Sequence, residues 1–468
     1  MKKIALLLTV FTMTGMSAMA GGILTNTNQS IDFLRNPARD AAIGLDGVYS
    51  NPAGVVFMPE GFHLGINWQY AHQTRTIEST NPVFKLGRRN NQNSSTKTFE
   101  GVADAPVIPS IQIAYNMEHW SLQANLSVPG GGGACEFDNG LGSFESTVGN
   151  IASMLQPFGA RGYDMDSYMK GRQYYYGVQI GAACKVIDNL SLYGGLRMLY
   201  GDATYKAKIS NIQVKTANGY MDFGSYLTQI TPAAQAAGAG DKIAALEKYS
   251  QGVNLLCNQA GVGFAPIIGI DYRLGRFNFA AKYEFKTQIR MKNESSLNEA
   301  SEIPAVNKFR DGEKVNEDVP ALATLGVEYS PIDQVRFSIG GHYFFDKNAS
   351  WYGNSQENLS HNTYEILWGA EWDTTENLTF SAGAQLTRYG NTDEYINDMS
   401  YVVNSYSIGF GFNYKLSQKV SVKAAYFQTF YGDYNRVTQA DPTTGATIIG
   451  DSFTRTNRVF GVGCQLHL

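Results

Sequence analysis

The residues that could carry out acid–base or nucleophilic chemistry are scattered along this sequence and form no motif. Of its six histidines, His63 and His342 fall within alternating β sequence, and no serine nucleophile motif accompanies either of them. The cysteines show no metal-ligand spacing, and no nucleotide-binding loop is evident. We therefore expect no enzyme activity, no metal site and no cofactor, and we interpret both histidines as interior or packing residues.

The charged residues indicate ion pairing or contact with an anionic ligand. Arg35, Arg39 and Asp46 precede the first strand pattern, and they could form structural ion pairs or meet a ligand carboxylate; we favour the ion pairs. Four basic residues at strand positions are further candidates for a carboxylate partner: Arg336, Arg388, His342 and Lys282. The sequence does not select among these four.

The cysteines divide into two pairs. Cys184 and Cys464 fall at apolar positions of strand patterns and are expected to pack as small hydrophobic residues. Cys135 and Cys257 fall in expected loops of an exported chain, where a disulfide is chemically possible. Whether Cys135 and Cys257 pair stays open.

The first twenty residues have the pattern of a secretory signal peptide. Lys2 and Lys3 are followed by an apolar run from Ile4 to Val10, and Ala18-Met19-Ala20 forms a small-x-small cleavage site. We expect residues 1–20 to be removed and the mature chain to begin at Gly21. Because that position is not cysteine, we expect no lipoprotein anchor.

Strict alternation dominates the rest of the chain. In residues 406–416, YSIGFGFNYKL, apolar residues alternate with small and polar ones, which is typical of a strand between two different environments. We expect about fourteen strands of this kind. They are placed at 61–75, 105–117, 119–129, 172–187, 189–209, 261–274, 275–293, 317–331, 332–348, 362–373, 374–390, 403–417, 418–435 and 452–468.

The connections between these strands favour a membrane barrel over a soluble sandwich. Short links such as 186–189 and 373–377 alternate with long ones such as 130–171 and 211–260, as in outer-membrane barrels. Within the strand 362–373, one set of alternating positions carries Ile366 and Trp368, and the other carries Glu365 and Glu371. This pattern suits lipid outside and an interior where charges meet water or form ion pairs. We therefore predict an all-β fold, a transmembrane antiparallel β-barrel formed by residues 61–468 in the outer membrane of a Gram-negative bacterium.

Charge argues against a nucleic-acid partner. The 37 basic and 41 acidic residues give a net charge of −4, and no basic patch with interleaved aromatic residues is present. We expect outer-membrane lipids and a hydrophobic small molecule as partners of a monomeric protein.

Residues 21–60 do not alternate, and they carry a family resemblance. They contain Asn51, Pro52 and Ala53 after an Ala- and Gly-rich stretch, and a proline-flanked strand, a tight turn and a strand ending in glycine follow at 104–130. With the strand count and loop asymmetry, the chain resembles the FadL-type long-chain fatty-acid transporters, the OmpP1/FadL/TodX family. The resemblance implies that residues 21–60 form an N-terminal hatch that plugs the lumen, with Asn51-Pro52-Ala53 as its motif.

The resemblance also implies a route for the ligand, which is captured outside, passed to an interior pocket and released sideways where the third strand kinks. Proline cannot donate a ladder hydrogen bond and glycine accepts unusual backbone angles, so Val128, Pro129 and Gly130 are the candidate kink. Alternatively, these residues only begin the second outer loop. Four residues of the hatch could line the interior pocket or only wedge the hatch against the wall: Val55, Val56, Phe57 and Met58.

Two long loops, 137–169 and 220–256, are unusually apolar. Patches of this kind often bind a ligand, although here the loops could instead pack on each other as a cap. The candidate ligand-binding residues are Phe144, Leu155, Phe158, Phe223, Tyr226 and Leu227. In the family the capture groove involves the loops corresponding to 211–260 and 294–316. Because 294–316 is strongly charged here, 137–169 is the expected substitute.

Together these features predict passive uptake of hydrophobic small molecules, long-chain fatty acids or similar, across the outer membrane. The alternative is a general porin or a structural or adhesive barrel. A porin should have an open lumen, and the segment 21–60 argues against one.

Overall fold

A computed structural model describes residues 26–90, 94–297 and 304–468. The expected signal peptide lies outside this part of the chain. No helix among the described residues is long and apolar enough to cross a membrane.

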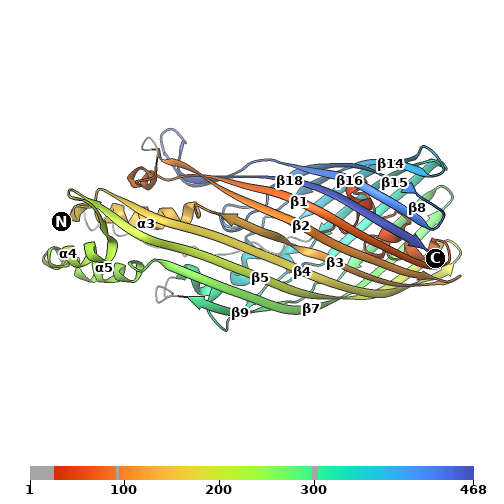
Figure 1. The fold of residues 1–468 in the computed structure, drawn as a ribbon, viewed down its shortest axis with the longest axis horizontal. Helices are drawn as coiled ribbons and strands as arrows, with labels where there is room; N and C mark the ends of the chain where they lie inside the picture. The colour runs from red at the N-terminus through yellow and green to blue at the C-terminus, as the bar shows by residue number, and fades with distance from the viewer. Residues whose placement is uncertain (1–25, 91–93, 298–303) are drawn as a thin grey trace.

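The described residues form one antiparallel sheet that closes on itself as a barrel of fourteen strands, as predicted (Figure 1). The ring closes because β1 pairs with β18 along its whole length, from His63 opposite His467 to Thr80 opposite Gly450. The ring strands are β1 (Gly61–Thr80), β2 (Thr96–Asn116), β3 (Trp120–Phe137), β4 (Gly162–Ile187), β5 (Leu190–Thr216), β7 (Val253–Leu274), β8 (Phe277–Glu284), β11 (Leu322–Ile332), β12 (Val335–Phe344), β13 (Tyr364–Asp373), β14 (Leu378–Arg388), β15 (Ser405–Lys415), β16 (Val420–Tyr431) and β18 (Thr447–His467).

Four shorter strands extend the ring at the end that carries the long loops. They are β6 (Gly219–Asp222), which pairs with β5, β9 (Arg290–Leu297) and β10 (Lys314–Asn316), which pair with each other, and β17 (Tyr434–Ala440), which pairs with β18. The predicted strand 275–293 is therefore interrupted, since residues 285–289 separate β8 from β9.

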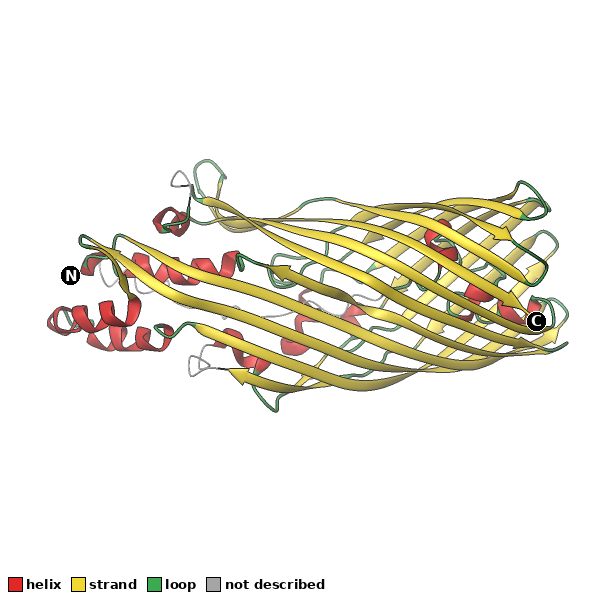
Figure 2. Cartoon of the chain, viewed as in Figure 1, coloured by secondary structure: helices red, strands yellow, loops and turns green. Residues whose placement is uncertain are grey.

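Helices occupy both ends of the barrel (Figure 2). Near the end with the short turns lie α2 (Ile31–Arg35), η1 (Leu45–Val48) and η2 (Gly54–Phe57). The helices of the long loops are η3 (Pro82–Leu86), α3 (Gly142–Met154), η5 (Gln156–Phe158), α4 (Phe223–Ala236), α5 (Gly240–Leu246), η6 (Glu247–Tyr249), η8 (Pro304–Phe309), η9 (Asp346–Asn348) and η10 (Tyr352–Asn358).

The strands of the two halves differ in length. β4 and β5 have 26 and 27 residues, whereas β12 and β13 have 10 each. Much of the sequence expected as loop at 76–104, 130–171 and 211–260 therefore continues as paired strand beyond the ring. In the extension of β2 the buried side chains are apolar or small, such as Phe99 and Ala103, and exposed neighbours such as Glu100 and Asp104 are charged, so the apolar-outward pattern of the ring does not continue there.

The outer face of the ring is apolar. Large side chains at alternating positions stay exposed, including Ile180 (60 % exposed) and Leu325 (67 % exposed), while their neighbours Gln179 and Thr324 are buried. A sheet with exposed apolar residues outside and buried polar residues inside is the arrangement of a barrel surrounded by lipid.

The ladder between β2 and β3 is interrupted. Val102 pairs with Glu136 and Ile111 with Leu126, and no pair joins the strands between these two points. The interruption coincides with Pro106, Pro109 and Pro129, which have no N–H to donate. The register of β3 against β4 also shifts here, between Ser127 and Gly133.

The lipid-facing assignment predicts the effect of a charge on the outer face. Replacing Leu325 with Arg should lower the free energy of unfolding by about 2–4 kcal/mol, because the guanidinium would lie within the hydrocarbon. Urea unfolding in lipid vesicles, followed by tryptophan fluorescence, measures this change.

The matched control is Gln439→Arg on β17, above the ring, where the side chain is already exposed to solvent. That change should alter stability little. Equal effects of the two substitutions would contradict the membrane assignment.

Candidate functional site

Residues 26–60, here called the N-terminal segment, lie inside the ring. Ser30 caps α2, since its Oγ accepts a hydrogen bond from the Phe33 N–H, and Asp32 and Arg35 match the helix dipole. Gly409 of β15 lies against the end of this helix: a Cβ there would come within 2.0 Å of the Leu34 carbonyl oxygen. The segment is thus in direct contact with the wall.

Inward-facing side chains satisfy the irregular backbone of the N-terminal segment. The Gln29 carbonyl accepts from Ser110 Oγ (2.6 Å) and Gln112 Nε2 (2.9 Å). Further carbonyls accept from the wall: Ala41 from Asn278, Val48 from Gln179, Tyr49 from Lys282, and Val55 from Asn116. This polar wall replaces the water that such a backbone would otherwise need.

The tripeptide Asn51-Pro52-Ala53 is anchored at each of its three residues. Asn51 Nδ2 donates to Asp271 Oδ2 at 2.6 Å, and its Oδ1 accepts from the Gly54 N–H. The Pro52 carbonyl accepts from Gln123 (2.8 Å), and the Ala53 carbonyl accepts from Ser191 (2.6 Å). The motif therefore joins the N-terminal segment to strands on one side of the ring.

Ion pairs hold the N-terminal segment to strands on the opposite side of the ring. Glu371 of β13 forms ion pairs with Arg35 and Arg39, each at 3.0 Å, and Arg39 also pairs with Asp46 at 2.8 Å. Asp32 pairs with Lys423 of β16. These pairs agree with the ion-pair interpretation of Arg35, Arg39 and Asp46.

Three of the four basic candidates on the strands are engaged by carboxylates. His342 lies between Asp40 (2.9 Å) and Glu365 (2.7 Å). Lys282 pairs with Glu284 at 2.6 Å. Arg336 pairs with Asp373 at 2.7 Å. Arg388, the fourth candidate, donates to the carbonyls of Thr387 and Ser405.

Val55, Val56, Phe57 and Met58 pack between the N-terminal segment and the wall. Val55 contacts a small cluster with Leu45, Val48 and Ala114, and Met58 packs against it. Val56 joins a second cluster on Tyr193 and Ile267, and Phe57 packs against that one. All four residues lie outside the linings of the two cavities described below.

An apolar cavity of about 640 Å³, here called the outer cavity, lies among the long loops. Phe144 and Ile151 of α3, Phe223 at the start of α4, and Tyr205 of β5 contribute to its lining. Its volume is in the range of small-molecule sites.

The outer cavity has one polar side. Arg436 pairs with Asp451 there, and Asp398 accepts a hydrogen bond from the Ser143 N–H at 2.8 Å. Burial and the neighbouring Asp451 carboxylate raise the pKa of Asp398 above its ordinary value. An apolar cavity with a few convergent polar groups is typical of a binding site.

The candidate residues of the two long loops separate into two groups. Phe144 and Phe223 line the outer cavity. Leu155, Phe158, Tyr226 and Leu227 lie outside that lining and pack together between α3 and α4, where the Tyr226 hydroxyl donates to the Phe158 carbonyl at 3.0 Å. The loops are thus a cap with a cavity in it, which combines the two interpretations of the sequence.

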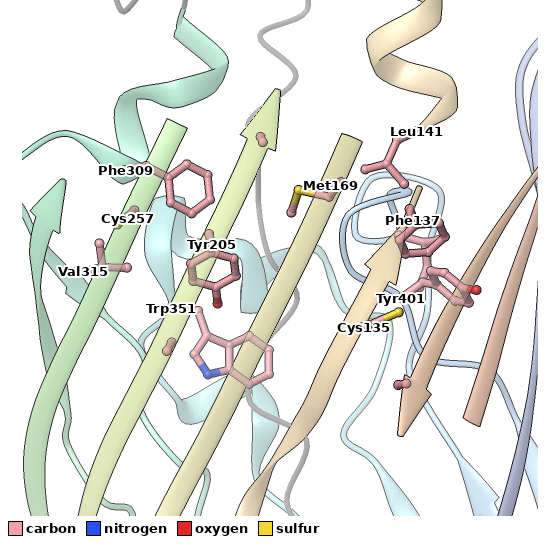
Figure 3. Close-up of a cluster of buried hydrophobic side chains, with 14 of the residues drawn as sticks. Cys135, Phe137, Leu141, Met169, Tyr205, Cys257, Phe309, Val315, Trp351 and Tyr401 are labelled. Atoms are coloured by element: carbon pink, nitrogen blue, oxygen red, sulfur yellow. The ribbon is translucent and has the colours of Figure 1, made fainter. Parts of the chain in front are cut away.

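Below the outer cavity, a layer of buried apolar side chains crosses the barrel (Figure 3). This mouth cluster shares Met169, Tyr205 and Phe309 with the outer cavity. It includes Cys135, Phe137, Cys257, Trp351, Tyr401 and Phe453. Cys135 and Cys257 are both buried and free, so the disulfide that the sequence left open does not form; Cys184 and Cys464 are half-buried and also free.

A second cavity of about 200 Å³, here called the inner cavity, lies between the mouth cluster and the N-terminal segment. Ala103 lines this cavity and belongs to the mouth cluster, and Tyr431 lines it and packs against that cluster. Asn26 and Asn28 of the N-terminal segment also line the cavity. Its walls are about half polar and half apolar, with Gln385 and Phe427 among the lining residues of the ring.

Val128, Pro129 and Gly130 lie at the edge of the interrupted β2–β3 ladder. Val128 lines the inner cavity, as do Gly131 and Gly133, whose φ angles of 109° and 73° are in the range that favours glycine. The Gln29 side-chain amide bonds both the N–H and the carbonyl of Val128, and the Asn26 N–H donates to the Pro129 carbonyl. The N-terminal segment thus takes the place of the missing strand partner.

Two arginines that the sequence interpretation missed lie beside this region: Arg455 lines the inner cavity, and Arg75 is its ladder partner. Arg75 of β1 and Arg455 of β18 are directly opposite each other in the ladder that closes the ring. The alternation of the strands alone could have placed both side chains inside. Ala71, Ile77 and Val459 lie an even number of positions from these arginines on the same strands, and all three are buried.

No family model and no curated relative matches this sequence. Solved structures match the fold along nearly the whole chain. A FadL homologue from Pseudomonas aeruginosa has 14 % identity and a TM-score of 0.64, over 96 % of this chain and 100 % of that one. The Ralstonia pickettii toluene transporter TbuX has 15 % identity and a TM-score of 0.53, over 93 % and 98 %. The Pseudomonas putida toluene transporter TodX has 13 % identity and a TM-score of 0.55, over 97 % and 99 %.

The closed ring, its apolar outer face and its filled lumen define a transmembrane β-barrel. More specifically, the chain has the fold of the FadL-type channels, so the resemblance expected from the sequence is confirmed for the fold. The same fold agrees with the predicted location in the outer membrane.

The ion pairs of the N-terminal segment predict that a single substitution of Glu371 lowers the free energy of unfolding strongly. Glu371→Gln leaves Arg35 and Arg39 without their shared carboxylate, and breaking a buried pair in this way costs about 3–5 kcal/mol. Denaturant unfolding in vesicles should report a loss of this size.

Glu60→Gln is the control, since Glu60 is exposed and should contribute little. A Glu371→Gln protein as stable as the wild type would show that the pairs do not fasten the segment.

Proposed function

We propose that this protein is a passive channel that takes up hydrophobic small molecules, long-chain fatty acids or similar, across the outer membrane. In this proposal the outer cavity captures the ligand, the inner cavity receives it, and the ligand leaves sideways between β2 and β3. The N-terminal segment acts as a hatch that blocks the axial route, and the barrel works as a monomer without catalysis.

The outer cavity supports capture. Burying a methylene group is favourable by about 0.8 kcal/mol, so an acyl chain gains affinity for an apolar lining without any covalent step. The cavity lies among the long loops, at the end of the barrel that an external ligand would reach first.

The observation that carries the lateral route is the interrupted β2–β3 ladder beside the inner cavity. Widening this seam breaks no β2–β3 ladder hydrogen bond between Val102 and Ile111, because none is present there. Elsewhere in the ring the same movement would expose unpaired backbone to lipid, which is costly. Since the β7 ladder is also interrupted, between Ala260 and Ile267, it is the position of the seam beside the inner cavity that favours it as the exit.

The filled lumen supports this function over a general porin. A porin needs a continuous aqueous channel, whereas the N-terminal segment here is bonded to strands around the ring. A polar solute entering the mouth would also meet the mouth cluster, which is apolar.

A disulfide across the seam tests the lateral route. An ideal Cβ on Gly133 would lie 4.0 Å from the Ala105 Cβ, a separation that a disulfide spans. The oxidised Ala105→Cys/Gly133→Cys protein should lose most uptake of a fluorescent fatty acid into cells, because the strands can no longer part, and reduction should restore it.

The control pair is Val102→Cys/Glu136→Cys, at ladder partners next to the seam that are already joined. Oxidation of this pair should leave uptake nearly unchanged. Full uptake through the oxidised Ala105/Gly133 pair would refute lateral release.

A charge in the outer cavity tests capture. Phe144→Asp should weaken binding of a long-chain ligand about tenfold or more, since an uncompensated carboxylate would face the chain. Phe158→Asp is the control within the same loop, outside the cavity lining. Equal binding by the Phe144→Asp protein and the wild type would remove the outer cavity from the route.

A further inference from the structure

The polar side of the outer cavity is acidic. Among the described residues that line this cavity, the charged ones are four carboxylic acids and a single arginine. The acids are Asp393, Glu394 and Asp398, on the loop between β14 and β15, and Asp451 of β18; the arginine is Arg436 of β17. Carboxyl groups therefore outnumber cations in this lining by four to one.

Arg436 has its donors engaged within the protein. Its Nε donates to Asp451 Oδ2 at 3.1 Å, and its Nη2 donates to the same oxygen. Its Nη1 donates to the Ile396 carbonyl at 2.8 Å. Because two-point contact with a guanidinium is how arginine binds a carboxylate, and Asp451 already occupies this guanidinium, a ligand carboxylate would find no equivalent partner here.

Asp398 has acceptor capacity that the protein leaves unused. It is 4 % exposed and accepts a hydrogen bond from the Ser143 N–H, at the start of α3, while it forms no ion pair among the described residues. A carboxylate has about four acceptor sites on its two oxygens, so one hydrogen bond leaves most of them open. A buried carboxyl group that lacks a cation is costly unless a donor reaches it.

Asp393 and Glu394 extend the acidic side to the margin of the cavity. Both side chains are exposed and still belong to the lining. Asp393 accepts a hydrogen bond from the Tyr434 hydroxyl at 2.9 Å, and neither acid forms an ion pair within the part of the chain that the structure describes. A ligand that enters from this margin meets negative charge first, and then the buried Asp398.

We propose that the outer cavity selects amphiphiles whose polar end donates hydrogen bonds, an ammonium or a hydroxyl group, over amphiphiles that end in a carboxylate. Asp398 accepts from the polar end, and the apolar lining around Phe144, Ile151 and Phe223 holds the chain. A fatty acid meets this requirement as the neutral acid, whose O–H donates. This inference rests on the proposed function and specifies the substrate class at its capture site.

The chemistry of the three polar ends sets the expected order of affinity. An ammonium group has three N–H donors and opposes the negative charge of the lining, and charge-assisted hydrogen bonds are about twice as strong as neutral ones. A hydroxyl group donates one hydrogen bond without a charge. A carboxylate has only acceptors and adds a like charge where little water screens it. We therefore expect the ammonium to bind most tightly and the carboxylate least.

The test compares three twelve-carbon probes, dodecylammonium, dodecan-1-ol and dodecanoate, by titration calorimetry of the full barrel at neutral pH in a nonionic detergent. The wild type should bind dodecylammonium about tenfold or more tightly than dodecanoate. Asp398→Asn keeps an oxygen that can accept from Ser143 and should reduce this ratio about fivefold, since it removes the charge from the hydrogen bond. Asp241→Asn, exposed on α5 and outside the lining, is the matched control and should keep the wild-type ratio.

Asp393→Asn/Glu394→Gln tests the same selection without touching a buried group. Both side chains are exposed, so the fold should be unaffected, and the preference for dodecylammonium should again fall. An unchanged ratio in this protein and in Asp398→Asn would place the preference outside the outer cavity and would overturn the inference.

The remaining outcomes separate this inference from the proposed function. Equal binding of the three probes by the wild type, or tighter binding of dodecanoate, would overturn the selection while leaving the proposed function standing. Binding of none of the probes would overturn the proposed function itself. Ethylammonium should compete with dodecylammonium only at far higher concentration, since it lacks the chain; competition at equal concentration would identify a site for free cations and would overturn the amphiphile assignment.

Discussion

Backbone hydrogen bonding inside a closed barrel is the constraint on which this structure depends. Irregular backbone is tolerated at membrane depth only where protein or enclosed water satisfies its polar groups. The N-terminal segment meets this requirement through the inward side chains of the ring: Ser110, Gln123, Ser191 and Asn278 each donate to one of its carbonyls. The polar interior therefore holds a folded segment instead of lining an open channel, and the same segment bonds the kinked part of β3 through Gln29.

That constraint also explains why the seam between β2 and β3 lies where it does. Prolines on both strands remove ladder donors, and an unpaired stretch facing lipid would be costly unless something else bonds it. The start of the N-terminal segment supplies the bonds to Val128 and Pro129. Movement of the N-terminal segment and opening of the seam are consequently linked, because movement of the segment would remove the hydrogen-bond partners of Val128 and Pro129.

Much of the fold could be predicted because lipid outside and a filled interior impose strict alternation. Fourteen strands follow from residues such as those of 406–416, where every second side chain is apolar. The outer extensions of β4 and β5 were missed because nothing forces alternation beyond the membrane. The long apolar loops were recognised from composition, but only tertiary packing decides that Phe144 and Phe223 line a cavity while Leu155 and Leu227 pack together. Arg75 and Arg455 are 380 positions apart in the numbering, and only the closure of the ring brings them together.

The central claim is that a hydrophobic ligand passes from the outer cavity to the inner cavity and leaves through the seam, not along the barrel axis. Photo-crosslinking tests it most directly: a long-chain fatty acid with a diazirine along its chain is supplied to the outer face of cells, and labelled residues are mapped by mass spectrometry. The account predicts labels at the outer cavity, the mouth cluster and the strand segments 103–110 and 127–135. Labels concentrated instead on the wedge residues Val55 and Val56 and on the short turns below them would show an axial route and would contradict the account.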